Sequence, residues 1–470
     1  MPLRMSRRTK VAGCTAVAAA LLAAPLALAA PASAAPKPPI VDFNGDGYAD
    51  LAIQAPFGSL QGVAHAGYVS IVYGSPTGMD LEHPENISQD LTWVPGEASE
   101  TYFGSSTAAR DLDGDGYTDL VVSAGNNNSA IVWGTSGGLH EATALSGHLS
   151  GLVDGDFNGD GEGDFAARTN GTVKVFLGPF TRAGAPASTT TLPEDRDDVY
   201  DLVAGDMNGD GKDDLVTTHG HEERAYKARW WKGTSTGLSK TYKTTGHYTD
   251  GGVIADVNMD GYGDYVASDV GSVSEMSMYE AGTVRVVYGG ASGPTTRTAT
   301  ITQDTKGVPG VGEAGWRGGD DSDYGDQFGY SLAAGDVTGD GYPDIAVGVP
   351  GEDIGSVRDA GSVVLLKGGR AGLTGTGAQA VDQSDAGVPG ASEAGDQFGR
   401  EVSLLDVNSN NRADLAVSAP TEDGTYKDSG AVWVFRGSKA GLTTTSITSF
   451  GPKTVWGPEK EAMFGSGFAK

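Results

Sequence analysis

Cysteine and long apolar runs are the first absences in this 470-residue sequence. Its one cysteine, Cys14, lies near the N-terminus, so the rest of the chain has no disulfide and must be stabilised by packing and bound ions. After residue 30 no apolar run reaches the roughly 18 residues that cross a membrane. The lack of long apolar runs and the 73 glycines exclude a helical bundle and favour short strands joined by tight turns.

Basic residues are also scarce. The sequence has 32 Lys and Arg against 61 Asp and Glu, which gives a formal charge of −29. Nucleic acids and anionic membranes are poor partners for such an acidic surface. We therefore expect no nucleic-acid partner and no membrane span.

The N-terminal segment has the pattern of a secretory signal peptide. Arg4, Arg7, Arg8 and Lys10 precede an alanine- and leucine-rich stretch over 11–30, which ends near small residues at 32–34. The sequence predicts a signal peptide over 1–35, a domain over 36–470 and an extracellular location. General secretion and twin-arginine export both stay open.

One nine-residue pattern, beginning with Asp42-Phe-Asn-Gly-Asp-Gly-Tyr-Ala-Asp50, recurs seven times. Oxygen-bearing side chains stand at positions 1, 3, 5 and 9, and in most copies a glycine at position 6 permits a sharp bend. Ca²⁺ prefers about 6–8 oxygen ligands, and tight loops with alternating carboxylates supply several of them. Ordinary Asp- and Asn-rich turns are the alternative, but seven copies in one register favour calcium loops.

The predicted ligands follow the same four positions in every loop. In chain order they are Asp42, Asn44, Asp46 and Asp50; Asp111, Asp113, Asp115 and Asp119; Asp156, Asn158, Asp160 and Asp164; Asp206, Asn208, Asp210 and Asp214; Asp256, Asn258, Asp260 and Asp264; Asp336, Thr338, Asp340 and Asp344; and Asp406, Asn408, Asn410 and Asp414. The seventh loop has lost a carboxylate at Asn410 and the glycine at Asn411. We expect five or six strong calcium sites and a weak seventh.

Each loop is followed by a short apolar run, such as Ile345-Ala-Val-Gly-Val-Pro350, which is typical of a strand. The unit around the sixth loop also offers strands before Asp336, at 361–368 and at 378–384. Four antiparallel strands make one blade, and such units need neighbours to bury their apolar faces. The sequence predicts an all-β, seven-bladed β-propeller.

The two chain ends predict how the ring closes. Only Pro38-Pro39-Ile40-Val41 precede the first loop, too few residues for an opening strand, whereas the chain ends in Phe464-Gly-Ser-Gly-Phe-Ala469. We expect 464–469 to pair beside 51–54 and complete the first blade, which also removes exposed sheet edges.

A Phe-Gly pair precedes the loop at Phe103, Phe328 and Phe398, and Ala-Pro follows it at Ala419-Pro420. This combination resembles FG-GAP repeats, the units of the integrin α-subunit propeller and of many secreted bacterial proteins. The third to fifth units lack Phe-Gly but keep the loop. The resemblance implies a monomeric, non-catalytic binding or adhesion platform for a protein or cell-surface ligand, contacted on the face opposite the calcium turns.

Two other functions stay open: a carbohydrate-binding lectin, with aromatic contacts near Trp93, Tyr102, Trp316 or Tyr324, and a propeller-based polysaccharide lyase or hydrolase. Enzyme signatures are weak. The Gly-x-Ser-x-Gly match over 134–138 recurs in related form at 74–78, 233–237 and 437–441, which indicates a repeated turn. His219 and His221 read as a solvated loop tip more readily than as a metal site.

Overall fold

The short apolar runs of the sequence form strands that lie in seven separate sheets. The computed structural model describes Met1 and residues 40–125, 128–193, 198–222, 224–315 and 324–469. Apart from Met1, the predicted signal peptide lies outside these residues and stays a prediction. Residues Ala34–Lys470 form one compact unit.

Every sheet has four strands, and we number the sheets as blades 1 to 7 in chain order. The strands are β28 (Gly467–Phe468), β1 (Leu51–Ala55), β2 (Tyr68–Tyr73) and β3 (Asp80–Ile87) in blade 1; β4 (Thr107–Arg110), β5 (Asp119–Val122), β6 (Ala130–Trp133) and β7 (Glu141–Ala144) in blade 2; β8 (Ser150–Gly155), β9 (Asp164–Thr169), β10 (Thr172–Leu177) and β11 (Ser188–Thr191) in blade 3; β12 (Asp198–Gly205), β13 (Asp214–His221), β14 (Arg224–Thr234) and β15 (Gly237–Thr244) in blade 4; β16 (Thr249–Ala255), β17 (Asp264–Asp269), β18 (Val284–Val287) and β19 (Thr298–Ile301) in blade 5; β20 (Leu332–Gly335), β21 (Asp344–Val349), β22 (Ser362–Leu366) and β23 (Gln379–Val381) in blade 6; and β24 (Val402–Leu405), β25 (Asp414–Ala419), β26 (Ala431–Ser438) and β27 (Gly441–Phe450) in blade 7.

Neighbouring strands within a blade are antiparallel and follow chain order, apart from β28. The only helix in the described residues is a 3₁₀ turn, η1 (Ser274–Tyr279). None of the helices described is long and apolar enough to span a membrane.

The middle strands of a blade are buried on both faces. Strands β2, β5, β21 and β25 are buried along their whole length, whereas the outer strands β7 and β11 are largely exposed. A strand covered on both faces reads as a continuous apolar run and not as an alternating one. The apolar runs after each loop follow from this burial.

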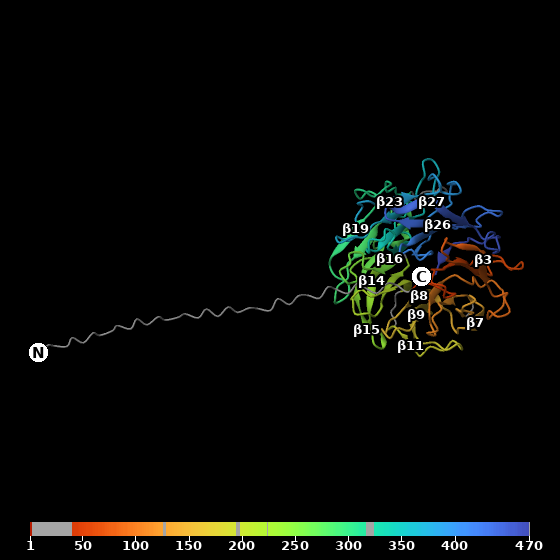
Figure 1. The fold of residues 1–470 in the computed structure, drawn as a ribbon, viewed down its shortest axis with the longest axis horizontal. Helices are drawn as coiled ribbons and strands as arrows, with labels where there is room; N and C mark the ends of the chain where they lie inside the picture. The colour runs from red at the N-terminus through yellow and green to blue at the C-terminus, as the bar shows by residue number, and fades with distance from the viewer. Residues whose placement is uncertain (2–39, 126–127, 194–197, 223, 316–323, 470) are drawn as a thin grey trace. The chain divides into compact units, whose positions relative to one another are not determined.

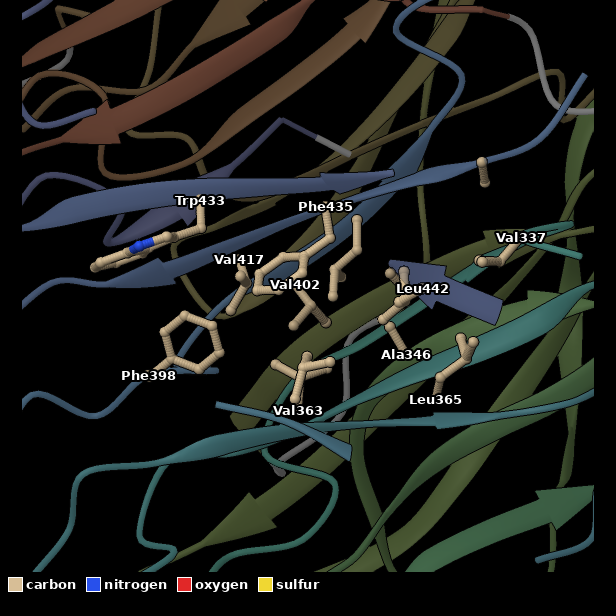
Figure 2. Packing of buried hydrophobic residues seen from close by; sticks show 14 of the residues in the cluster. Val337, Ala346, Val363, Leu365, Phe398, Val402, Val417, Trp433, Phe435 and Leu442 are labelled. Carbon is tan, nitrogen blue, oxygen red and sulfur yellow. The ribbon is translucent and has the colours of Figure 1, made fainter. Parts of the chain in front are cut away.

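Seven apolar clusters, each between two consecutive blades, hold the sheets in a closed ring (Figure 1). The seventh cluster joins blade 7 to blade 1, where Val434 of β26 packs with Leu51 of β1. Figure 2 shows the interface of blades 6 and 7, in which Phe398 meets the Trp433 ring edge to face at 5.3 Å between centroids. The predicted seven-bladed, all-β propeller is confirmed.

The predicted closure by the C-terminal residues is also confirmed. Strand β28 pairs with β1, so that Phe468 faces Ile53 and Gly467 faces Gln54. Beyond the paired residues, the Ala469 N–H donates to the Ala52 carbonyl at 3.1 Å. The last residues of the chain therefore supply the inner strand of the first blade.

Phe-Gly pairs link blades 2, 6, 7 and 1 to the blade that precedes each of them in the ring. Phe103, Phe328, Phe398 and Phe464 are fully buried. Their N–H groups donate to carbonyls just before the third strand of the preceding blade, as Phe328 does to Ala281 at 2.9 Å and Phe464 to Ser429 at 3.0 Å. A Cβ at the adjacent glycine, Gly282 or Gly430, would collide with this backbone. The Phe-Gly pair near the C-terminus therefore docks as the internal ones do.

Candidate functional site

The seven acidic turns lie between the first and second strands of the blades, and all fold around the carboxylate at position 1. In every loop the N–H groups at positions 5 and 6 donate to this carboxylate; in the first loop Asp46 and Gly47 donate to Asp42 at 3.1 and 2.8 Å. Position 6 is left-handed throughout, with φ 87° at Gly47 and 63° at Asn411. Asparagine tolerates this conformation, so the turn survives in the seventh loop.

The aspartate at position 9 fastens each loop to the third strand of its blade. Its Oδ1 accepts the N–H of a glycine at the end of that strand, as Asp50 does from Gly74 at 2.9 Å and Asp414 from Gly437 at 2.8 Å. The same bond is present in the five other blades. These aspartates are at most 2% exposed. Position 9 is therefore a structural anchor as well as a candidate ligand.

Burial makes the charge of these anchors costly. It raises the pKa of Asp50 to about 8, that of Asp119, Asp164 and Asp264 to about 7, and that of Asp214 and Asp344 to about 6. A buried carboxylate that is charged at neutral pH needs a positive partner. A cation within the turn would provide one.

The oxygen positions fit a hard cation in the first two loops most directly. Carboxylate oxygens of Asp42, Asp46 and Asp50 lie within 4.8 Å of one another, as do those of Asp111, Asp113 and Asp115. At position 3, Asp113 Oδ1, Thr338 Oγ1 and Asn408 Oδ1 are buried and have no hydrogen-bond partner. Buried oxygens without a partner in an acidic turn are suited to Ca²⁺ coordination.

The amide nitrogens of the position-3 asparagines are engaged inside their own loops. Asn208 and Asn258 donate Nδ2 to the position-9 aspartate at about 3.0 Å, and Asn408 does the same. In the first and third loops Asn44 and Asn158 donate to the position-5 aspartate instead. The structure thus brings the predicted residues together in each turn, while their role as ligands stays a prediction.

A second set of acidic residues, which sequence reasoning missed, lies on the opposite face. Asp326 and Glu352 line a hollow of about 400 Å³ beside Glu313 and Asp353. Asp396 and Glu422 form the matching pair one blade further on, beside Glu393 and Asp423. The repeated Asp-Gln-Phe-Gly and Glu-Asp sequences at these sites were the available signal.

The carboxyl groups of both opposite-face pairs are buried or partly buried, and in each pair the glutamate accepts a hydrogen bond from a glutamine. Burial raises the pKa of Asp326 and Glu422 to about 7 and that of Asp396 to about 6, and the neighbouring carboxylates add to each shift. Gln303 donates to Glu352, and Gln383 donates to Glu422 at 2.9 Å. Between blades 1 and 2, Thr101 replaces the aspartate and donates to the corresponding Gln89 at 2.9 Å.

We expect Asp326 and Glu422 to stabilise the fold in acid and to lose this contribution as the pH rises from about 4 to about 8. Asp326 and Glu422 have higher pKa values in the folded than in the unfolded state, so their contribution is complete below the unfolded pKa and is lost as pH rises through about 7. Over this pH range the melting temperature of Asp326→Asn and of Glu422→Gln should change by about 2 °C less than that of the unmodified chain. An unchanged slope in both variants would contradict the assignment.

The apparent enzyme motif is a turn, as predicted. Gly138 N–H donates to Thr135 O at 2.9 Å, and Ser75 and Gly78 form the same contact in blade 1. The interpretation of the histidines was wrong for His219. It lies in strand β13, only 3% exposed, with Nε2 at 2.6 Å from Thr217 Oγ1, because the strand continues through residues that the sequence suggested were a loop.

Three large exposed aromatic side chains lie in separate loops opposite the acidic turns. Trp456 is 67% exposed, Tyr426 49% and Tyr324 44%. Trp93 packs against the core between blades 1 and 2, and Tyr102 stacks on His65 at 5.3 Å between centroids. Trp316 lies outside the described residues.

The sequence matches two related family models. The FG-GAP repeat model matches residues 39–72, 103–138, 328–366 and 398–435, and the FG-GAP-like repeat model matches 156–217. These matches cover six of the seven acidic loops, all but the fifth at Asp256. The loops at Asp42, Asp111, Asp336 and Asp406 lie in the first set, and the loops at Asp156 and Asp206 lie in the second.

Curated relatives match over shorter stretches. Integrin alpha-5 of Xenopus laevis is 38% identical over 106 residues, which are 22% of this chain and 10% of that protein. Phosphatidylinositol-glycan-specific phospholipase D of Bos taurus is 34% identical over 123 residues, 26% of this chain and 14% of that protein. The matches thus span about a tenth to a seventh of these relatives.

Among solved structures, an Agrocybe aegerita lectin that recognises terminal N-acetylglucosamine covers 88% of this chain and 94% of its own, with 14% identity and a TM-score of 0.48. That score is too low to add to the assignment. The repeats, the integrin α relatives and the seven four-stranded blades agree without it. The chain is an FG-GAP repeat protein, similar to integrin α-subunits and folded as a seven-bladed β-propeller.

Proposed function

We propose that this protein is a secreted, calcium-stabilised propeller that binds a protein or cell-surface ligand without catalysing a reaction. The observation that carries the proposal is the combination of integrin-like repeats with a closed ring whose loops are anchored at both ends by buried strands. A ring built in this way holds its loops in fixed positions, which lowers the entropic cost of binding.

The face opposite the acidic turns supplies the contact residues in this proposal. Exposed aromatic side chains are frequent energetic centres of protein interfaces because they bury a large area at a small entropic cost. Trp456, Tyr426 and Tyr324 project from loops on this face. The acidic clusters around Asp326 and Asp396 lie on the same face and favour a partner with basic groups.

Calcium has a structural part in this proposal. The acidic turns face away from the aromatic loops, so bound cations would stabilise the blades and leave the contact surface free. Extracellular calcium modules commonly bind at about 10⁻⁴ to 10⁻³ M, a range that suits a secreted protein.

We expect Trp456→Ala and Tyr426→Ala to weaken ligand binding about tenfold or more while leaving the melting temperature within about 1 °C. The purified chain, immobilised in calcium, is first used to capture partners from culture fluid and cell-surface extract. Binding of the captured partner is then titrated. Tyr242→Ala is the matched control, since Tyr242 is 43% exposed but lies on the outer strand β15.

Equal binding by Trp456→Ala, Tyr426→Ala and Tyr242→Ala would contradict the proposed face. Capture of one defined glycan from an array would point to the lectin alternative. Turnover of a polysaccharide by the purified chain would overturn the non-catalytic proposal. The match to phospholipase D of Bos taurus covers only 14% of that protein and gives no ground for assigning its named activity to this chain.

A further inference from the structure

One side chain at or near the end of each third strand stands next to the acidic turn of the same blade. It directly precedes the glycine whose N–H binds the position-9 aspartate. In chain order these side chains are Tyr73, Trp133, Leu177, Lys232, Tyr288, Lys367 and Arg436. Three of the seven are basic, and two of these three reach into the turn.

In the fourth loop, Lys232 contacts two of the predicted calcium ligands. Its Nζ lies 2.8 Å from Asp210 Oδ2 and 3.5 Å from Asn208 Oδ1, the oxygens at positions 5 and 3. A second ammonium, that of Lys212, lies 3.7 Å from the other Asp210 oxygen. The ammonium of Lys232 thus occupies the side of the loop on which a cation would have to meet these oxygens.

In the seventh loop, Arg436 pairs with the buried anchor. Its Nη1 lies 2.9 Å from Asp414 Oδ2, and both side chains are largely or fully buried. The other guanidinium nitrogen, Nη2, donates to Thr77 O of blade 1 at 2.7 Å. A Cβ at Gly78 would lie 1.5 Å from this nitrogen. The guanidinium therefore fits against the turn of blade 1 only because residue 78 is a glycine.

The remaining loops differ in this respect. In the first, third, fifth and sixth loops, no basic side chain of the described residues forms an ion pair with a predicted ligand. Lys367, in the position equivalent to Lys232, donates instead to the Ala440 carbonyl at 2.8 Å. In the second loop Arg182 pairs with both Asp113 and Asp115, but that loop has four carboxylates. Three negative charges therefore remain after the pairing, as many as in the first loop, and Asp113 Oδ1 stays without a partner.

We propose that Lys232 and Arg436 neutralise the fourth and seventh loops in place of a divalent cation, so that blades 4 and 7 are stabilised without calcium. The inference rests on the proposed calcium binding by the other loops. A divalent cation entering either turn would meet a fixed positive charge at less than 4 Å from the same oxygens, which is strongly repulsive. The seventh loop also lacks the carboxylate at position 5, where Asn410 stands.

Calcium stoichiometry of the whole chain tests the fourth loop. Equilibrium dialysis with radioactive Ca²⁺ should give one more bound ion per molecule for Lys232→Gln than for the unmodified chain, because Asp206, Asp210 and Asp214 remain available. Lys367→Gln is the matched control and should bind the same number of ions as the unmodified chain. An unchanged stoichiometry in Lys232→Gln would overturn the inference for this loop.

Thermal melts test the seventh loop. Arg436→Gln leaves the buried Asp414 without a cation and should lower the melting temperature by about 3–5 °C, equally in excess calcium and in excess chelator. An unchanged melting temperature of Arg436→Gln in both conditions would show that the guanidinium does not stabilise the loop and would overturn the inference here.

The two proposals fail in different ways. If the unmodified chain binds no calcium at all, the proposed calcium stabilisation is wrong, whereas the melt of Arg436→Gln in chelator still decides whether Arg436 supports the loop. If the unmodified chain binds seven ions, calcium stabilisation stands, and the inference that Lys232 and Arg436 take the place of calcium in two loops is wrong.

Discussion

Removal of calcium should lower the melting temperature of this propeller by about 5–10 °C. A ligand at ten times its dissociation constant stabilises the folded state by about 1.4 kcal/mol per site, and five occupied loops together supply about 7 kcal/mol. A chain of this length loses about 1 °C of melting temperature per kcal/mol. Calorimetry in 1 mM calcium and in excess chelator measures the difference.

Single substitutions should locate the calcium effect. Asp111→Asn removes the central carboxylate of the second loop and should reduce the calcium-dependent shift, whereas Asp406→Asn at the same position of the seventh loop should leave it unchanged. Both aspartates accept the same backbone N–H groups, so the pair is matched in structure. Identical melting curves with and without calcium would refute calcium stabilisation.

Deletion of 464–470 should have the largest effect on the fold, a loss of more than about 10 °C in melting temperature or of soluble protein altogether. The deletion removes the inner strand of blade 1 and the buried Phe464 and Phe468 from the cluster that joins blades 7 and 1. It also exposes the edge of β1, which favours aggregation. Thermal melts and light scattering of the shortened chain measure both effects.

A single substitution tests the closing contact without removing the C-terminal residues. Phe464→Ala should cost about 3–5 kcal/mol, the usual cost of removing a buried phenylalanine. Phe328→Ala, at the equivalent position between blades 5 and 6, should cost a similar amount because both rings are fully buried. A shortened chain that melts like the full one would show that β28 does not close the ring.

The repeat allowed much of this fold to be predicted from the sequence. Seven acidic loops in one register, each followed by an apolar run, predicted the number of blades, and the short segment before Asp42 predicted a strand from the C-terminus. A repeated unit restricts the fold strongly because each copy has to pack on its neighbours in the same way. The Phe-Gly pairs supported the same repeat.

Contacts between distant residues could not be predicted in this way. The pairing of Lys232 with Asp210 depends on the direction in which the lysine side chain extends. Lys367, at the equivalent position of blade 6, extends toward the Ala440 carbonyl instead. Likewise, Asp326 and Glu352 line one hollow only because the connection between blades 5 and 6 converges with the β21–β22 loop of blade 6. His219 was assigned to a loop because its neighbours are polar, but β13 extends beyond its apolar part.

The position of β28 has a consequence for biosynthesis. Strand β28 is translated about four hundred residues after β1, so blade 1 stays incomplete while the intervening blades are synthesised. We expect the ring to close only once residues 464–469 have been made, and a stop codon before them to yield an open and aggregation-prone product.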